Sequence, residues 1–525
     1  MQLRFLLLFL FGGILLGHSQ DKTKIASEKY PVSYDFGEKY NDRYRYSNLM
    51  TFEEGESDNK ILVRAYYTGL ILKPKGYLIE RYDSELQLID EFNYKFRGAD
   101  FLDGFTANGQ IYLLFIEYDP ERLSYIYTVH QSPVGSYDFK KKNLLVVPSV
   151  YVENPVEKNY FNRNFTSGFS TTILFDRDQR AFALSLHYKK RKDNQHRIII
   201  YDYNMNPVFD QDFSGEIEDK NYAFEGFKMA PDFSAAYLVG KAYFKKRRFK
   251  AEERKFQYEV VKIAAGGTQT ASYDLPGKFS EGMKPLWKNN SLYLVGFYAD
   301  RRDNRYNGID FIAIKPGTLE AVKRQHNPFS EQFMKDKFGT ENEKVVKNLV
   351  FKDAQFTADG SLLFNAEEYF VTRSLESNAS GGRVQKERFH YNDIVSIKLD
   401  ADGKMLWARN INKTEVTQGD GAYASYTSFS KDGNTYFFIC TAADNPRLLN
   451  NERLIFKQGL SRNRNVFLIR IDGQGQVSYE KIIDQEEARL PLMVSKPLIC
   501  DDSDTVYFYA KRGSKKQLVA VKIQG

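Results

Sequence analysis

One pattern of apolar and polar positions recurs along the chain. A turn signal precedes an apolar stretch that ends in an aromatic residue, and a polar loop then leads into another apolar stretch. The pattern is clear in "NGQIYLLFIEY", Asn108 to Tyr118, and in "KNNSLYLVGFY", Lys288 to Tyr298. Further copies lie at Arg177 to Tyr188, Pro231 to Tyr243, Ala358 to Tyr369, Lys431 to Ala442 and Asp501 to Lys511, after a weaker first copy at Asp58 to Tyr67. Short alternating runs of this kind predict β-strands.

A second pair of strands follows the loop in many of these units. Examples are "IVSIKLDADGKMLWARNI" and "VFLIRIDGQGQVSYEKII", in which apolar positions alternate on both sides of a short polar turn. An Asp stands near the end of the first strand, and Asp, Asn and Gly fill the turn. These residues tolerate the backbone conformations that a hairpin needs. Each unit therefore predicts four antiparallel strands.

Eight such units recur at intervals of roughly 50 to 70 residues, which is longer than in the familiar propeller repeats. A four-stranded unit repeated in this way predicts an all-β β-propeller of eight, or seven, blades. The segments "APDFSAAYLV", "TADGSLLF" and "SKDGNTYFF" resemble the strand-opening turns of TolB-like and WD-repeat-like propellers. "LDADGKMLWARNI" resembles the hairpin turn of quinoprotein-like repeats. The resemblance is to a superfamily and implies a fold only. Two smaller propellers or a solenoid remain alternatives.

The ends of the chain refine this organisation. Residues 1–19 have the charged start, short apolar run and small-residue end of a signal peptide. The last unit stops one strand short, so the segment 20–46 is expected to supply a ring-closing strand from Lys29 to Phe36, ahead of a propeller over 47–525. A helical excursion is predicted at 327–348, with Ser330 as its cap and Gly339 as its stop. No second apolar run is long enough to span a membrane. We therefore expect a periplasmic or secreted protein.

Charge and cysteine content exclude some classes of function. The chain carries 75 Lys and Arg against 68 Asp and Glu, a net charge of +7, which is far from the excess of a nucleic-acid-binding protein. The only two cysteines, Cys440 and Cys500, lie in apolar runs. They are expected to be buried free thiols, with a disulfide as the alternative.

Basic residues concentrate in one kind of loop. With the strands of a blade lettered A to D from the axis outward, the stretch "YFKKRRFKAEERKFQY", Tyr243 to Tyr258, falls at a B–C connection, and most other B–C connections are also basic. A basic face attracts anions. We therefore predict an anionic glycan, an envelope component or an acidic protein as partner. The alternative is a set of solvated hairpin tips. The candidate ligand-binding residues are Lys189, Lys190, Arg191, Lys245, Lys246, Arg247, Arg248, Arg301, Arg302 and Arg305.

Motifs for catalysis, cofactors or metals are scarce. The six histidines form no H-x-x-H pair, no G-x-S-x-G motif occurs, and no phosphate-binding glycine loop precedes a helix. The sequence therefore indicates no cofactor and no metal. Glu225, Glu281 and Asp353 lie at or near predicted inner strands, where paired carboxylates do the work in propeller glycosidases and lyases. The predicted function is thus a binding or scaffold propeller, with a carbohydrate-active enzyme as the alternative.

Overall fold

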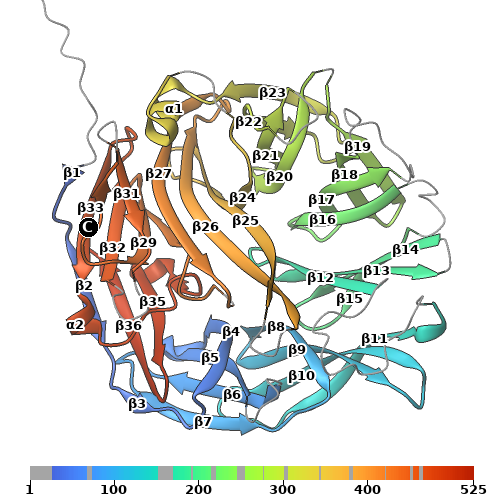
Figure 1. Ribbon diagram of the computed structural model, residues 1–525. Helices are drawn as coiled ribbons and strands as arrows, with labels where there is room; N and C mark the ends of the chain where they lie inside the picture. Colours follow the sequence, from blue (N-terminus) through green and yellow to red (C-terminus); the bar gives the residue numbers. More distant parts are fainter. Residues whose placement is uncertain are drawn as a thin grey trace, which may run out of the picture.

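Eight four-stranded sheets surround one central axis in the computed structural model (Figure 1). The structure describes residues 26–67, 74–151, 169–190, 193–213, 220–244, 255–275, 277–300, 305–341, 345–377, 382–419, 421–449, 453–459 and 465–524. Within each sheet the four strands pair antiparallel in the order A, B, C, D. The predicted propeller fold is confirmed, and it has eight blades arranged as a single disc.

The first four blades contain consecutive strands. Blade 1 is built from β4 (Tyr46–Glu54), β5 (Lys60–Tyr67), β6 (Pro74–Tyr82) and β7 (Leu88–Tyr94). Blade 2 is built from β8 (Ala99–Ala107), β9 (Gln110–Asp119), β10 (Ser124–Pro133) and β11 (Lys140–Pro148). Blade 3 is built from β12 (Phe169–Asp176), β13 (Ala181–Lys190), β14 (Asp193–Asp202) and β15 (Pro207–Asp212). Blade 4 is built from β16 (Lys220–Met229), β17 (Ala235–Phe244), β18 (Phe256–Ala264) and β19 (Gly267–Ser272).

Blade 5 also contains consecutive strands, and the last three blades include additions. Blade 5 is built from β20 (Phe279–Lys288), β21 (Ser291–Ala299), β22 (Gly308–Ile314) and β23 (Ala321–Pro328). Blade 6 is built from β24 (Leu349–Phe356), β25 (Leu362–Ser377), β26 (Arg383–Leu399) and β27 (Met405–Thr417), extended by β31 (Leu454–Lys457) and β30 (Arg447–Leu448). Blade 7 is built from β28 (Thr427–Lys431), β29 (Asn434–Thr441), β32 (Asn465–Ile471) and β33 (Val477–Ile483), with β1 (Ala26–Ser27) beside β33. Blade 8 is built from β34 (Leu498–Cys500), β35 (Thr505–Arg512), β36 (Lys515–Ile523) and β2 (Val32–Phe36), with β3 (Tyr40–Asn41) also on β36.

The Asp noted near the strand ends closes the C–D turns. Asp83, Asp202, Asp400 and Asp472 hold the same position in blades 1, 3, 6 and 7. Each carboxylate accepts hydrogen bonds of 2.8–2.9 Å from the backbone N–H groups two and four residues later. Such local bonds stabilise a turn before any tertiary contact forms. The repeat could therefore be recognised in the sequence, because the residues that form each turn lie within a few positions of one another.

The N-terminal segment completes the last blade, as its sequence predicts. β2 pairs antiparallel with β36 over the register from Val32 opposite Ile523 to Phe36 opposite Val519. Blades 8 and 1 then share an apolar cluster that includes Leu49, Tyr507 and Leu518. A strand near the start of the described chain and the last strand of the chain thus lie side by side in one blade.

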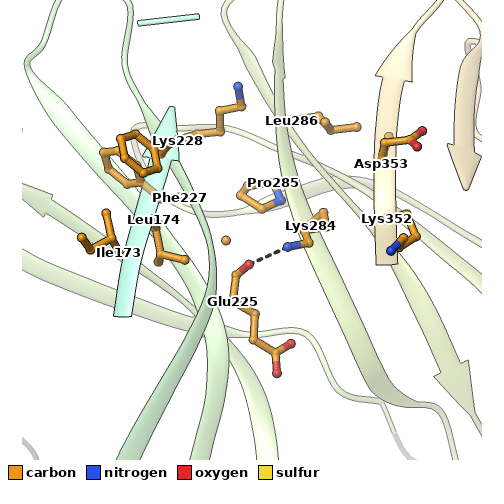
Figure 2. A pocket seen from close by; sticks show the side chains of 13 residues that line it. Ile173, Leu174, Glu225, Phe227, Lys228, Lys284, Pro285, Leu286, Lys352 and Asp353 are labelled. Carbon is orange, nitrogen blue, oxygen red and sulfur yellow. Dashed lines mark hydrogen bonds between the residues drawn. The ribbon is translucent and has the colours of Figure 1, made fainter. Parts of the chain in front are cut away.

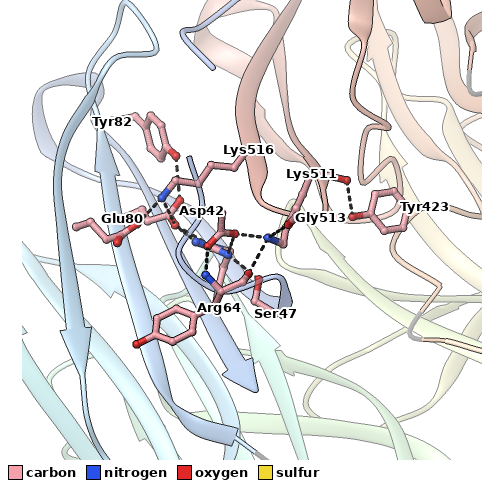
Figure 3. Close-up of polar contacts among 11 residues, drawn as sticks. Asp42, Ser47, Arg64, Glu80, Tyr82, Tyr423, Lys511, Gly513 and Lys516 are labelled. Carbon is pink, nitrogen blue, oxygen red and sulfur yellow. Dashed lines mark hydrogen bonds and ion pairs between the residues drawn. The ribbon is translucent and has the colours of Figure 1, made fainter. Parts of the chain in front are cut away.

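A mostly buried set of charges also joins blade 8 to blade 1 (Figure 3). We call it the seam network: Asp42, Arg64, Glu80, Glu91, Lys511 and Lys516. All of these residues are buried except Glu91, which lies at the solvent-facing edge of the network. Arg64 Nη1 lies 2.7 Å from Asp42 Oδ2, and Lys516 Nζ lies 2.9 Å from Glu80 Oε1. Further ion pairs join Arg64 to Glu80, Lys511 to Asp42 and Lys516 to Glu91.

Two carboxylates of this network, Asp42 and Glu80, are held in the ionised form by their cation partners. Burial by itself would raise the pKa of Glu80, but Arg64 and Lys516 outweigh it and hold that pKa below its ordinary value. The pKa of Asp42 is lowered in the same way, with burial opposed by Arg64 and Lys511. Cations and carboxylates that bury together in this way neutralise one another.

One helix and one inserted hairpin pack on blade 6. Helix α1 (Glu331–Phe338) begins after Ser330, whose Oγ accepts a hydrogen bond from Phe333 N, and ends at Gly339, which adopts a left-handed conformation. Its Lys337 lies 2.6 Å from both Glu368 and Asp393, so the helix is fastened to the blade. The B–C connection of blade 7, expected to be a loop, contains β30 and β31, and β31 pairs parallel with β27. The outer edge of β27 pairs with β31, and nothing in the sequence indicated this pairing.

Two smaller predictions were also checked. Cys440 and Cys500 are free and buried, which confirms the first of the two expectations for them. Among the described residues, no helix is both long enough and apolar enough to cross a membrane. The proposed signal peptide lies outside the described residues, so export stays a prediction.

Candidate binding site in the central pocket

The inner strands of blades 3, 4, 5 and 6 enclose a pocket of about 320 Å³ (Figure 2). We call it the central pocket. β12, β16, β20 and β24 each contribute three or four consecutive residues to it. Its apolar wall consists of Ile173, Leu174, Phe175, Phe227, Pro285 and Leu286. Mainly apolar walls with a few placed polar groups are typical of small-ligand sites.

A recurrent irregularity shapes the inner strands. β16, β20 and β24 each carry one extra residue, namely Glu225, Glu281 and Lys352, where the pairing with the B strand shifts register. Such a β-bulge turns a side chain away from the regular alternation. Gly226 follows the first bulge, and a Cβ there would lie 2.4 Å from Pro285 Cδ. The glycine therefore permits the close approach of β16 and β20 at the pocket wall.

Lys284 is the distinctive polar group of the pocket. Its Nζ donates a hydrogen bond of 2.7 Å to the backbone carbonyl of Glu225 (Figure 2). No carboxylate in the described part of the chain lies within ion-pairing distance of this ammonium group. Burial lowers the pKa of Lys284, and the charge of Glu225 opposes this only in part. The pocket therefore holds a positive charge that is neither fully hydrated nor neutralised.

The other two lysines of the pocket have carboxylate partners. Lys228 Nζ lies 2.9 Å from Asp176 and 2.6 Å from Asp178. Burial would lower the pKa of Lys228, but these two carboxylates raise it above its ordinary value. Lys352 Nζ lies 3.4 Å from Glu367 Oε2. Lys284 thus stands apart from both.

Two of the three predicted carboxylates line this pocket, and Glu281 does not. The Glu225 carboxylate accepts hydrogen bonds from Lys241 Nζ at 2.8 Å and from Tyr258 OH at 2.6 Å. Asp353 accepts from Asn365 Nδ2 at 2.7 Å and from Ser428 Oγ. Burial raises the pKa of Asp353, against those two hydrogen bonds and Lys352. Of the three candidate carboxylates, two therefore line the pocket, and both already have hydrogen-bond partners.

Most of the predicted basic site lies outside the described residues. This holds for Arg191, Lys245, Lys246, Arg247, Arg248, Arg301 and Arg302. The backbone of Lys189 and Lys190 forms the end of β13, opposite Asn194 and Asp193 of β14, so these two residues flank the B–C connection of blade 3. Arg305 is described and half-buried, next to Tyr306, whose N–H donates to the carbonyl of Val346. Their role in binding stays a prediction.

The long hairpin of blade 6 shows what other basic B–C residues do. Arg373 pairs with Glu387 at 2.7 Å, while Lys386 and Arg388 both pair with Glu376 at 2.6 and 2.5 Å. Here the basic residues are matched by acidic ones across the two strands. In this hairpin the solvated-tip alternative describes the charges better than an anion site does.

Sequence reasoning missed Lys284. A single lysine within a strand has no distinctive signal, because most such lysines face solvent. The surrounding segment "EGMKPLW", Glu281 to Trp287, did offer a hint, since Gly and Pro within a strand often mark a bulge or a close backbone approach.

Comparisons with known proteins agree on the fold and go no further. No protein-family model matches the chain, and no curated protein matches it. Among solved structures, the chain is similar to the polysaccharide lyase Uly1, at 11% identity and a TM-score of 0.37, over 96% of each chain. It is also similar to the β-propeller domain of the Trilobed protease from Pyrococcus furiosus, at 8% identity and a TM-score of 0.35, over 82% of this chain and 94% of that domain.

A third group of similar structures consists of larger enzymes. A prolyl endopeptidase matches at 9% identity and a TM-score of 0.34, over 81% of this chain and 46% of the enzyme. The chain thus spans about half the length of such peptidases. At these identities the likeness concerns the β-propeller fold alone, and the function must be argued from the residues.

Proposed function

We propose that the protein is an exported β-propeller that binds an anionic ligand, such as an acidic glycan or another envelope component. The observation that carries the proposal is the Lys284 ammonium group, which lines a pocket with apolar walls and, among the described residues, donates to a backbone carbonyl and pairs with no carboxylate. A bound carboxylate or sulfate would neutralise it. A partly buried charge without a counter-ion is unfavourable for folding and is more often retained at a functional site.

The basic B–C connections add a second, longer-ranged contribution. Lys and Arg gathered on one face raise the local potential and increase the rate of encounter with a polyanion. Their effect falls as ionic strength rises, because salt screens exposed charges over about 10 Å at 0.1 M. The two contributions can therefore be separated by experiment. Binding through the pocket should change little with salt concentration, whereas attraction to the basic face should weaken as the salt concentration rises.

The test measures binding of polygalacturonate and of heparin to the mature protein at two salt concentrations. Lys284→Met should weaken binding at both concentrations. Reversal of Lys245, Lys246, Arg247 and Arg248 to Glu should weaken it mainly at low salt. Lys315→Met is the matched control, since Lys315 is exposed and already pairs with Glu320. Wild-type protein that binds neither polyanion would refute the proposal.

A second candidate is a glycosidase or lyase that acts in the same pocket. The raised pKa of Asp353 favours it, because a general acid must carry its proton near neutral pH. This candidate predicts release of new reducing ends from an acidic polysaccharide, and loss of that release in Asp353→Asn. A binding protein would leave the polysaccharide intact.

A further inference from the structure

A second pocket opens where blade 1 meets blade 8. It has a volume of about 220 Å³, and we call it the seam pocket. Its lining comes from the start of β4, the end of β5, the β35–β36 connection and the segment before β28. Tyr46 pairs with Tyr67 at the B–C end of the A and B strands of blade 1, so the pocket lies on the B–C side of the disc. None of the predicted site residues belongs to it.

An exposed aromatic ring and an exposed guanidinium group form its outer wall. Tyr46 is 57% exposed, whereas most aromatic residues in the described ranges are buried or half-buried. The Arg45 guanidinium lies 5.6 Å from the centre of the Tyr46 ring. Arg45 forms no ion pair with any residue in the described ranges. A planar guanidinium held against a ring keeps its donor fork free for a carboxylate or sulfate.

The floor of the pocket is held rigidly by the seam network (Figure 3). Lys511 Nζ donates to the carbonyls of Tyr44 and Gly513 at 3.1 and 3.0 Å and pairs with Asp42. Ser47 Oγ accepts a hydrogen bond of 2.6 Å from Arg64 Nη1. The buried cations below the pocket are therefore already neutralised, and Arg45 is left as its cation for a ligand.

The opposite wall of the seam pocket is formed by Tyr423, Tyr67 and the side-chain amide of Asn48. Tyr423 OH donates to the Lys511 carbonyl at 3.1 Å, and Asn48 Nδ2 lies 3.4 Å from Tyr67 OH. An amide group has two N–H donors and a carbonyl acceptor, so Asn48 can also bond to a hydroxyl-bearing ligand, and the Tyr423 hydroxyl adds a second polar group to this wall. Because these side chains are tied to one another, little conformational entropy is lost when a ligand binds.

We propose that the seam pocket binds one acidic sugar unit of a glycan. The sugar ring packs on the face of Tyr46, its carboxylate or sulfate pairs with Arg45, and its hydroxyls meet Asn48 and Tyr423. The pocket is large enough for one sugar ring and too small for a folded protein surface element, which selects a glycan among the anionic ligands. This inference rests on the proposed function and deepens it, because it names the ligand class and a subsite away from the central pocket.

The experiment measures binding of three oligosaccharides to the mature wild-type protein by calorimetry: tetragalacturonate, a sulfated dextran oligosaccharide and neutral maltotetraose. The first two arms distinguish a carboxylate from a sulfate. Arg45→Gln should weaken binding of the preferred acidic oligosaccharide at least tenfold, and Tyr46→Ala should weaken it by a similar factor. Both side chains are exposed, so neither change should alter the melting temperature.

Arg43→Gln is the matched control. Arg43 is exposed and stacks on Tyr44 at 5.7 Å in the same segment, but it does not line the pocket. Equal loss in Arg43→Gln and Arg45→Gln would overturn the seam pocket in favour of diffuse charge. Wild-type affinity retained in Arg45→Gln but lost in Lys284→Met would also overturn it, while leaving the proposed function intact. Equal affinity for maltotetraose and the acidic oligosaccharides would refute the role of Arg45.

Discussion

The seam network and the central pocket place the same kind of residue in opposite situations. At the seam, Arg64, Lys511 and Lys516 are buried against Asp42, Glu80 and Glu91. In the central pocket, Lys284 is also withdrawn from water but meets a backbone carbonyl and no carboxylate in the described ranges. The seam charges are neutralised within the fold, whereas Lys284 has no carboxylate partner among the described residues.

The pKa directions express part of the same difference. At the seam, opposite charges overcome the effect of burial on the two buried carboxylates, and the pKa values of Asp42 and Glu80 fall below their ordinary values. Burial still prevails at Lys511 and lowers its pKa, even though this lysine pairs with Asp42. In the pocket, burial prevails and the pKa of Lys284 is lowered. Neutralised charges contribute to the specificity of the fold, whereas an unneutralised one favours any ligand that supplies the missing charge. Burial alone therefore does not show what a charged residue does.

The largest effect is expected when the strand that crosses the seam is removed. Deletion of residues 20–40 removes β2 and leaves the edge of β36 unpaired from Val519 to Ile523. It also exposes the apolar cluster on which Tyr30 and Val32 pack. We expect the cooperative melting temperature to fall on the order of 10 °C. Deletion of residues 20–25 alone is the control and should leave it unchanged; equal melting of the 20–40 deletion and the full chain would show that β2 is dispensable.

A smaller but still large effect is expected from one substitution in the seam network. Arg64→Met leaves Asp42 and Glu80 buried beside fewer cations. Removing one partner of a buried ion pair costs about 3–5 kcal/mol in the free energy of unfolding. Urea denaturation measures the change in midpoint. The matched control is Arg373→Met, which breaks the exposed pair with Glu387 and should shift the midpoint little. Similar shifts of the midpoint in the two variants would show that the buried ion pairs of the seam stabilise the fold no more than an exposed pair does.

The smallest effect on stability is expected in the central pocket. Lys284→Met should change the free energy of unfolding at neutral pH by no more than about 1 kcal/mol, in the stabilising direction. The folded protein lowers the pKa of Lys284, so the unfolded chain binds more protons below the ordinary lysine pKa of about 10.4, and wild-type stability should rise with pH in that window. The stability gap between variant and wild type should thus narrow between pH 7 and pH 10. A constant gap would mean that Lys284 is not destabilised by burial.

Much of the fold was predictable because its determinants are local. The C–D turns can be recognised in the sequence from Asp400 and Asp472. The carboxylates of these residues accept hydrogen bonds from backbone N–H groups only two and four residues away. The last unit visibly lacked a strand, so the pairing of β2 with β36 followed from counting strands. Ser330 and Gly339 marked the ends of α1 in the same way. The addition of β31 to blade 6 was not predictable, since its partner β27 belongs to a different repeat.

The candidate sites were much less predictable. Asp42 and Lys511 are 469 residues apart in the sequence, so nothing near either residue reveals their ion pair. Glu225 and Asp353 were found from their positions on inner strands, but their hydrogen-bond partners come from neighbouring strands and blades. Arg45 and Tyr46 lie at the end of the segment that was predicted to close the ring. The pocket beside them forms only because Lys511 and Gly513 of blade 8 lie next to them in the folded protein.

The sequence by itself determined the repeat, the turns, the four-stranded unit and the propeller fold, because each of these follows from residues close together in the chain. The tertiary structure decided which charged side chains of the described residues pair with an opposite charge and which, such as Lys284, do not. That decision depends on the Coulomb interaction and on burial, and both are set by groups that only the completed disc brings within a few ångströms of one another.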